Sequence, residues 1–157
     1  KNCRILGTLV LLNAGSASNI DMDIHWEAAV WNYPALMVEG DLEMKWHGNH
    51  NLRESQHNMS FNSTGTPYQG TEDTDEVDEY PPLIKGLVYV SGNLAITKEC
   101  HLEGVVIVGG ATGVDDILAL TYDSAFLNNP PPGFSTGTVM QIVPGTWRRE
   151  AYSPYAR

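Results

Sequence analysis

A glycine-centred motif recurs along this chain and constrains its fold more than any other feature. The motif places one apolar residue two positions before a glycine, and two more at two and four positions after it. Its copies are centred on Gly7, Gly40, Gly86, Gly92 and Gly104. Apolar residues with a period of two are the signal of a strand with one buried face. The repeat therefore predicts several short and similar strands.

The spacing of the later copies predicts how these strands are connected. Gly86 and Gly104 are 18 residues apart, and Gly92 follows Gly86 by six. These steps suit a coil of three short faces, which buries its apolar side chains only by stacking on other coils. Glycine suits the bends and the close approach of neighbouring coils. We expect an all-β fold, a single-stranded, right-handed β-solenoid (β-helix) with one long loop insertion, since parallel β crossovers strongly prefer the right hand.

The alternation also predicts which side chains face the interior. We expect inward-facing residues at positions 5, 9, 11, 38, 42, 44, 84, 88, 90, 94, 96, 102, 106 and 108. A half-buried strand from Ile20 to Trp26 and a further rung at Ile117–Tyr122, after a loop over 109–116, extend the pattern, with a last strand at Val139–Val143. No window has a sustained apolar period of 3.6, so long helices are not expected.

The chain has 157 residues, which suits one domain spanning 1–157. The pattern lapses between residues 47 and 82, which we interpret as an insertion, in which Met59 and Phe61 suit one irregular rung. A C-terminal tail over 128–157 begins with consecutive prolines that cannot donate to a strand ladder.

The charge balance excludes some partners. Nine basic against 19 acidic side chains give a net charge of -10, which argues against nucleic acid and against anionic lipid. No stretch approaches the roughly 18 to 20 apolar residues of a membrane span, so no membrane insertion is expected. Because the sequence opens with Lys1, we expect a mature or trimmed product whose export signal or anchor lies outside it.

Three sets of residues are candidates for chemistry. Asp73, Asp75 and Asp78 offer oxygen ligands to calcium, although a solvated acidic loop has the same composition. His47, His50 and His57 form a loose histidine cluster that we interpret as polar loop residues rather than metal ligands. Asp115 and Asp116, with Asp123 on the next rung, are candidates for glycoside hydrolysis by paired carboxylates. We favour the alternative that the adjacent pair forms local hydrogen bonds in a turn.

Aromatic residues and cysteines complete the candidate set. Trp46, Tyr68 and Tyr80 flank or occupy the insertion and are expected to contact a partner, since aromatic rings provide large contact areas. Cys3 and Cys100 either form a disulfide that closes a long loop or remain two separate thiols.

The second half of the chain resembles a known group of proteins. The resemblance is carried by Tyr80–Leu94, Leu102–Gly110, Leu120–Ser124, Asn129–Phe134 and Trp147–Glu150. These segments resemble β-solenoid portions of bacterial cell-envelope proteins associated with type IV pilus assembly, often from planctomycete-like genomes. The glycine rhythm is also similar to that of bactofilins, which are polymer-forming cytoskeletal β-helices. The chain differs from these proteins by lacking the apolar N-terminal helix of a pilin and by carrying the insertion.

The resemblance implies a non-catalytic structural or assembly module of the cell envelope, pilus-associated and extracytoplasmic. It implies a protein or glycan partner of the envelope, with self-association as a further expectation, and no catalytic residues carry over. The alternatives are an extracellular adhesion or carbohydrate-binding module and, less favoured, a carbohydrate-active β-helix enzyme.

Overall fold

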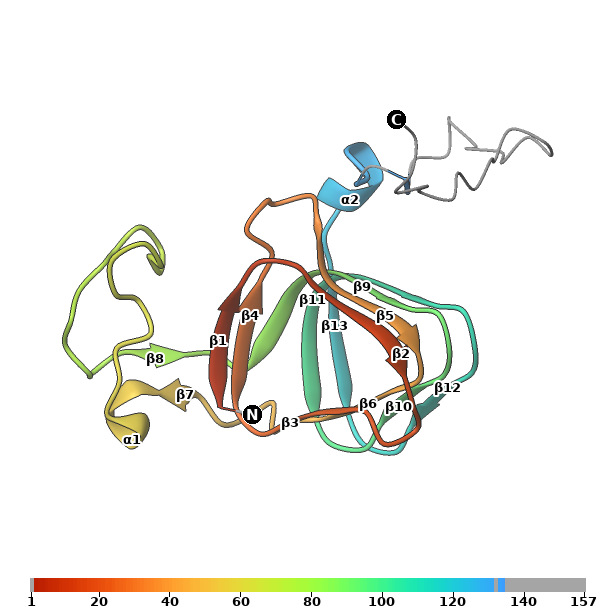
Figure 1. Cartoon of the computed structure of the whole chain (residues 1–157), viewed down its shortest axis with the longest axis horizontal. Helices are drawn as coiled ribbons and strands as arrows, with labels where there is room; N and C mark the ends of the chain where they lie inside the picture. The colour runs from red at the N-terminus through yellow and green to blue at the C-terminus, as the bar shows by residue number, and fades with distance from the viewer. Residues whose placement is uncertain (1, 132, 135–157) are drawn as a thin grey trace, which may run out of the picture.

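The computed structural model describes residues 2–131 and 133–134 of the chain, and its architecture is mostly β (Figure 1). In chain order the elements are β1 (Cys3–Leu6), β2 (Leu9–Ala14), β3 (Asn19–Asp21), β4 (Ile24–Glu27), β5 (Pro34–Gly40), β6 (Leu42–Lys45), β7 (Leu52–Arg53), α1 (Glu54–His57), β8 (Glu79–Tyr80), β9 (Leu83–Val90), β10 (Leu94–Ile96), β11 (Cys100–Val108), β12 (Thr112–Val114), β13 (Leu118–Tyr122) and α2 (Ala125–Asn128).

The strands stack as successive coils of the chain. One sheet has the order β1-β4-β9-β11-β13, with β2 and β5 continuing it beside β9, and a second has the order β12-β10-β6-β3. Every pairing within these two sheets is parallel. Strands that are distant in sequence therefore lie side by side in Figure 1, as solenoid-like stacking requires.

The glycines of the motif stack as their spacing predicts. β11 pairs with β9 so that Gly104 lies opposite Gly86, and the offset of 18 residues holds along the whole pairing. Gly104 has a φ of +136°, and a Cβ there would collide with the carbonyl oxygen of Gly86. The sequence needs glycine at this corner both for its backbone conformation and for the close approach of the coil below.

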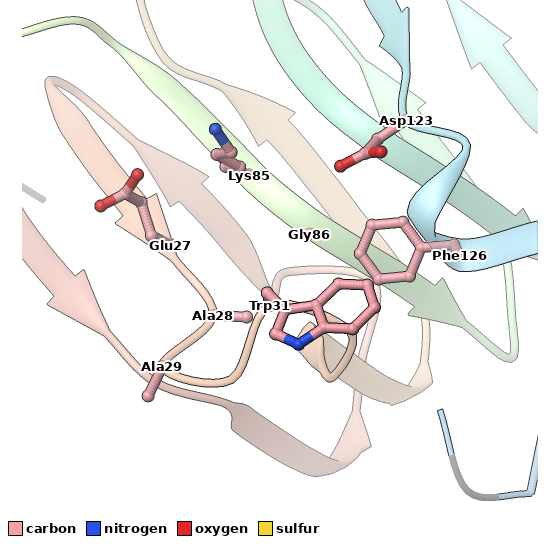
Figure 2. A pocket seen from close by; sticks show the side chains of 8 residues that line it. All are labelled: Glu27, Ala28, Ala29, Trp31, Lys85, Gly86, Asp123 and Phe126. Carbon is pink, nitrogen blue, oxygen red and sulfur yellow. The ribbon is translucent and has the colours of Figure 1, made fainter. Parts of the chain in front are cut away.

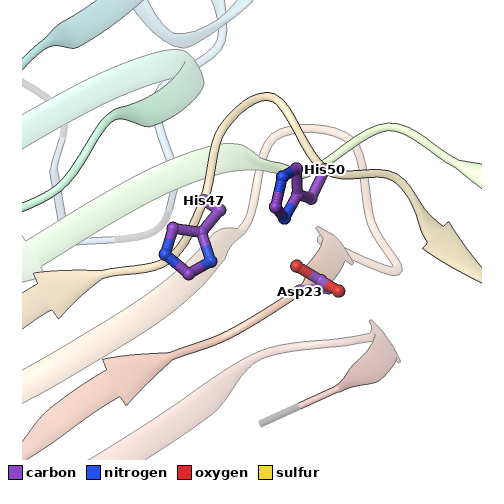
Figure 3. Close-up of side chains that lie close together, drawn as sticks. All are labelled: Asp23, His47 and His50. Atoms are coloured by element: carbon purple, nitrogen blue, oxygen red, sulfur yellow. The ribbon is translucent and has the colours of Figure 1, made fainter.

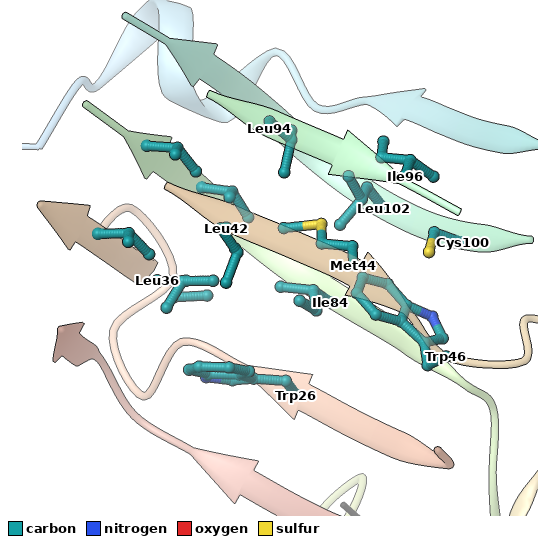
Figure 4. Close-up of a cluster of buried hydrophobic side chains, with 14 of the residues drawn as sticks. Trp26, Leu36, Leu42, Met44, Trp46, Ile84, Leu94, Ile96, Cys100 and Leu102 are labelled. Carbon is teal, nitrogen blue, oxygen red and sulfur yellow. The ribbon is translucent and has the colours of Figure 1, made fainter. Parts of the chain in front are cut away.

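The core consists of columns of apolar side chains that run through the stack (Figure 4). Trp26, Ile84 and Leu102 occupy matching positions on three successive strands, and each is at most 3% exposed. Of the positions predicted to face inward, 38, 42, 44, 84, 88, 90, 94, 96 and 102 are buried, whereas 5, 11, 106 and 108 are half-buried. Leu9 is the exception at 40% exposed, because the first coil has no described coil beneath it.

Three local predictions require correction. The expected strand from Ile20 to Trp26 is two strands, β3 and β4, separated by a corner at Met22, whose φ is +69°. The segment predicted as a loop over 109–116 contains β12, which continues the second sheet. Met59 and Phe61 belong to no strand, so the irregular rung predicted there is absent.

The cysteines are free thiols three strands apart in the first sheet. Cys3 is on β1 and Cys100 on β11, with β4 and β9 between them. Three strand spacings of about 4.8 Å separate them by roughly 14 Å, about twice the reach of a disulfide. Burial raises the pKa of the Cys100 thiol to about 12. The separate-thiol alternative therefore holds.

The insertion forms a small unit beside the stack. β7 and β8 pair antiparallel, with Leu52 opposite Tyr80, and α1 follows β7 directly. Both described helices are four residues long, and neither is long or apolar enough to cross a membrane. The strand predicted at Val139–Val143 lies outside the described residues.

Candidate functional site

A pocket of about 280 Å³ opens at the outer side of the Gly86 corner (Figure 2). Glu27 and Lys85 enter it from β4 and β9, where they are register partners on the outward face. Asp123 follows β13, and Phe126 on α2 lies beside it in Figure 2. Trp31, 60% exposed, lines the same pocket. An open aromatic side chain next to carboxylates is a combination that suits polar ligands such as sugars.

Charges of opposite sign alternate along the stack at this pocket and beside it. Lys85 Nζ lies 3.0 Å from Oε1 of Glu103, its partner on the next coil. The hydrogen bond to Glu103 is the largest cause that raises the pKa of Lys85. The His25 imidazole, whose Nε2 lies 3.6 Å from Oε2 of Glu27, is the largest influence that lowers the pKa of Glu27. Lys85 is thus flanked by carboxylates, which makes the pocket a poor site for anions.

The three aspartates considered for glycoside hydrolysis do not come together. Asp123 lines the pocket, and its Oδ1 accepts a hydrogen bond of 2.8 Å from the backbone of Ala125. Asp115 and Asp116 lie in the turn before β13, both exposed and outside the pocket lining.

The charged residues that do join Asp123 were missed by the sequence reasoning. Glu27 and Lys85 immediately precede the corner residues Ala28 and Gly86. Because each of them stands directly before a corner residue, the sequence could have predicted that their side chains lie close together.

A buried carboxyl group organises the insertion. Glu54 is 0% exposed and accepts hydrogen bonds from the backbone N–H groups of Phe61 and Asp78 and from the hydroxyl of Tyr80, the last at 2.8 Å. Burial and the bond to Glu54 raise the pKa of Tyr80. Three donors from distant points of the insertion converge on this one side chain.

Arg4 fastens the insertion to the first coil. Its guanidinium donates to the carbonyl oxygens of Phe61 at 2.8 Å, Thr66 at 2.6 Å and Pro67. The same group lies over the rings of Tyr68 and Tyr80, 5.3 and 5.4 Å from their centroids. The insertion is thus packed on the stack, not a solvated excursion.

The residues predicted to bind calcium are only partly gathered. The amide nitrogen of Asn62 donates to Oδ2 of Asp73 at 3.2 Å and to Oδ2 of Asp78 at 2.7 Å. Asp75 instead accepts a bond from the backbone of Val77, so it holds a local turn. Burial and the nearby carboxylates raise the pKa of Asp78. Asn62 thus pairs with one oxygen of each carboxylate, while Oδ1 of Asp73 is buried without a hydrogen-bond partner among the described residues. Calcium binding stays a prediction.

The aromatic residues predicted to contact a partner have different environments. Trp46 and Tyr80 are each 0% exposed and contribute to packing, so neither offers contact area to a partner in this structure. Tyr68 is half-buried, with its ring centroid 4.6 Å from that of Tyr80. Of the three aromatic residues predicted to contact a partner, only Tyr68 therefore has part of its side chain at the surface.

Two of the three candidate histidines come together with an aspartate. Potential ligand atoms of Asp23, His47 and His50 all lie within 4.8 Å of one another, as Figure 3 illustrates. His57 is apart from them, beside the ring of Phe61 at 5.9 Å between centroids. Asp23 was not among the predicted ligands because it precedes the histidine pair by more than 20 residues.

Comparison with known proteins yields no match: no family model, no curated protein and no solved structure is similar to this chain.

Proposed function

We propose that this chain is a non-catalytic structural module of the bacterial cell envelope that assembles through the two open ends of its coil stack. A second copy of the chain is the proposed occupant, with one end of the stack meeting the opposite end of the next copy. The stack is proposed to be a single right-handed solenoid, as parallel crossovers favour.

The observation that carries this proposal is that the apolar columns of the core continue to both ends of the stack. Leu102 is 3% exposed, whereas Leu120, its register partner on β13, is 50% exposed. Leu36 is 0% exposed, whereas its partner Leu9 on β2 is 40% exposed. Apolar side chains at matching register positions are therefore buried in the middle coils and exposed in the coils at the two ends.

The backbone supports the same interpretation. β1, β2 and β13 are the outer strands of the first sheet, and β3 and β12 those of the second, within the described residues. An outer strand presents a row of unpaired N–H and C=O groups to which another chain can add. Because the two ends differ, such a contact joins the chains head to tail. Repeated contacts of this kind build an open filament, unless the rotation between neighbouring copies closes them into a ring.

The envelope setting and the link to pilus assembly rest on the resemblance of Tyr80–Leu94 and Leu102–Gly110 to such proteins. The net charge of -10 is compatible with a protein or cation partner.

Sedimentation velocity over a wide range of protein concentrations tests the proposal. We expect the sedimentation coefficient to rise with concentration in the parent chain. Leu120→Asp should abolish that rise, because it places a charge in the proposed interface. Val77→Asp, at a position 72% exposed in the insertion, is the matched control and should leave it unchanged. A parent chain that stays monomeric throughout contradicts the proposal.

The pocket at the Gly86 corner favours a second candidate, carbohydrate binding. Trp31 provides an exposed ring for a sugar face, while Glu27 and Asp123 provide acceptors for its hydroxyl groups. A glycan array followed by calorimetry tests it. Binding that Trp31→Ala abolishes supports a lectin-like role, and an array without any bound glycan contradicts it.

A further inference from the structure

A turn at the start of the insertion brings two imidazoles together. The segment His47-Gly48-Asn49-His50 is closed by a bond of 3.1 Å from the backbone N–H of His50 to the carbonyl of His47. The ring centroids of the two histidines are 5.2 Å apart. Figure 3 shows both rings next to the Asp23 carboxylate, which belongs to a different coil corner.

From this arrangement we propose that Asp23, His47 and His50 form a binding site for one divalent transition-metal ion of the zinc class. The site is independent of the calcium prediction for the acidic loop and of the proposed assembly through the coil ends.

The turn that carries the histidines is fixed on both sides. Trp46 before it and Leu52 after it are each 0% exposed. Gly48 donates its backbone N–H to the carbonyl of Glu99 at 2.8 Å, and a Cβ at Gly48 would press on that same oxygen. The imidazoles are therefore presented from a backbone that is already ordered, which reduces the entropic cost of binding.

The corner that carries Asp23 is equally well fixed. The Asp23 carbonyl accepts a bond of 3.2 Å from Cys3, and its N–H donates to Oδ1 of Asn2 at 3.4 Å. Both backbone groups of Asp23 are thus used by the first coil. Among the described residues, no hydrogen bond or ion pair occupies its carboxylate.

The separation of the three groups suits a metal ion. Ligand atoms around tetrahedral zinc, each about 2.0 to 2.1 Å from the ion, lie roughly 3.3 Å apart. The ligand atoms of the three residues lie within 4.8 Å of one another, which is wider than this spacing. Rotation of the exposed His50 side chain brings its imidazole nitrogen closer to the other two ligand atoms. Two imidazoles and one carboxylate favour zinc and its transition-metal neighbours over calcium, which requires oxygen ligands.

The surroundings favour a cation over an anion. Asn49, Asn51 and Arg53 line a polar hollow that also contains Asp23 and His50. The Arg53 charge is paired, since its Nε lies 3.1 Å from Oε1 of Glu79. Three protein ligands leave a fourth position for water or for a donor from a partner. Bound metal would clasp the start of the insertion to the corner between β3 and β4.

Calorimetric titration of the full chain with zinc chloride tests the site. We expect one ion per chain. Asp23→Asn, His47→Ala and His50→Ala should each weaken binding by at least about tenfold, the lower bound for losing even an outer-sphere partner. His57→Gln is the matched control, because it removes a histidine of the same insertion that lies outside the site, and it should retain the parent affinity.

Cobalt provides a second readout that does not depend on stability. The parent chain with cobalt(II) should give the intense visible absorption of low coordination number, and His50→Ala should lose it. Absence of saturable zinc binding at micromolar concentration overturns the proposal. Equal weakening by His57→Gln and His50→Ala also overturns it, because binding would then be an unspecific property of the histidines in this chain.

Discussion

The coil stack and the insertion are held together by different means. In the stack, β9 and β11 pair over seven consecutive residues, and apolar columns repeat the same contact from coil to coil. In the insertion, β7 and β8 pair over only two residues, and the remaining order comes from Glu54 and Arg4, side chains that each bind several distant backbone groups.

This difference determines how damage spreads in each region. A substitution that disrupts packing in one coil also destabilises the coils on either side, because neighbouring coils share one core. A fault in the insertion removes a few polar contacts and leaves the columns intact. We therefore expect global unfolding from changes in the stack and local opening from changes in the insertion.

The largest effect should come from Val88→Asp. Val88 is 1% exposed and lies in a column between Leu36 and Val106. An unpaired buried charge there should cost about 4 kcal/mol or more of the free energy of unfolding. Urea denaturation followed by circular dichroism measures it. Val77→Asp, in the insertion, is the control, and equal midpoints for the two variants would contradict the inward face.

A smaller effect is expected from Gly104→Ala. Strain at a positive φ and the collision with Gly86 should together cost about 3 kcal/mol. Gly7→Ala separates the two causes, since Gly7 has a φ of +146° but open space around it, and should cost about 1 kcal/mol. Gly113→Ala, which has neither feature, should be near neutral. The order of the three denaturation midpoints checks this ranking.

Glu54→Ala should open the insertion while the stack persists. The variant leaves the Tyr80 hydroxyl and two N–H groups without their acceptor, at a cost of about 2 kcal/mol. Hydrogen exchange should accelerate over 52–80 and remain slow in β9 and β11. Glu76→Ala, an exposed position in the same insertion, is the control. Faster exchange throughout the stack would show that the two regions unfold as one.

The smallest effect is the pH dependence of stability that two carboxyl groups contribute. Its sign is opposite in the insertion and in the stack. The pKa of Asp78 is raised, so its ionised form costs stability above that pKa, and the cost is relieved as the pH falls. Asp78→Asn should therefore raise the melting temperature slightly at pH 7 and have no effect near pH 3, where the carboxyl is protonated in both states.

Glu27 in the stack behaves in the reverse way. Its pKa is lowered from the ordinary value of 4.5, so its stabilising contribution is present above that value and is lost as the pH falls through the folded pKa. Glu27→Gln should lower the melting temperature at pH 7, and this effect should shrink as the pH falls below 4.5 toward the lowered folded-state pKa. The same sign of change at pH 7 for both variants would contradict the contrast between the regions.

The sequence predicted the stack well and its corners less well. Alternation around Gly86 and Gly104 specifies the inward face and the register, because the period of two and the step of 18 are properties of the local sequence. The corner at Met22 escaped prediction, since a non-glycine residue adopts the positive φ there. β12 escaped because its residues Thr112, Gly113 and Val114 have the composition of a turn.

The candidate sites were less predictable, for a physical reason. Asp23 meets His47 and His50, and Glu27 meets Lys85, only through coil stacking whose length varies from coil to coil. Trp46 and Tyr80 illustrate the converse, since aromatic composition does not distinguish a contact surface from a packed interior.

The stacking register is the central claim, and nuclear Overhauser contacts in a uniformly labelled sample test it most directly. We expect contacts between Gly86 and Gly104, between Val88 and Val106 and between Ile96 and Met44, each joining residues on adjacent parallel strands. Contacts that join these strands in antiparallel order, or at an offset other than 18 between β9 and β11, would contradict the account.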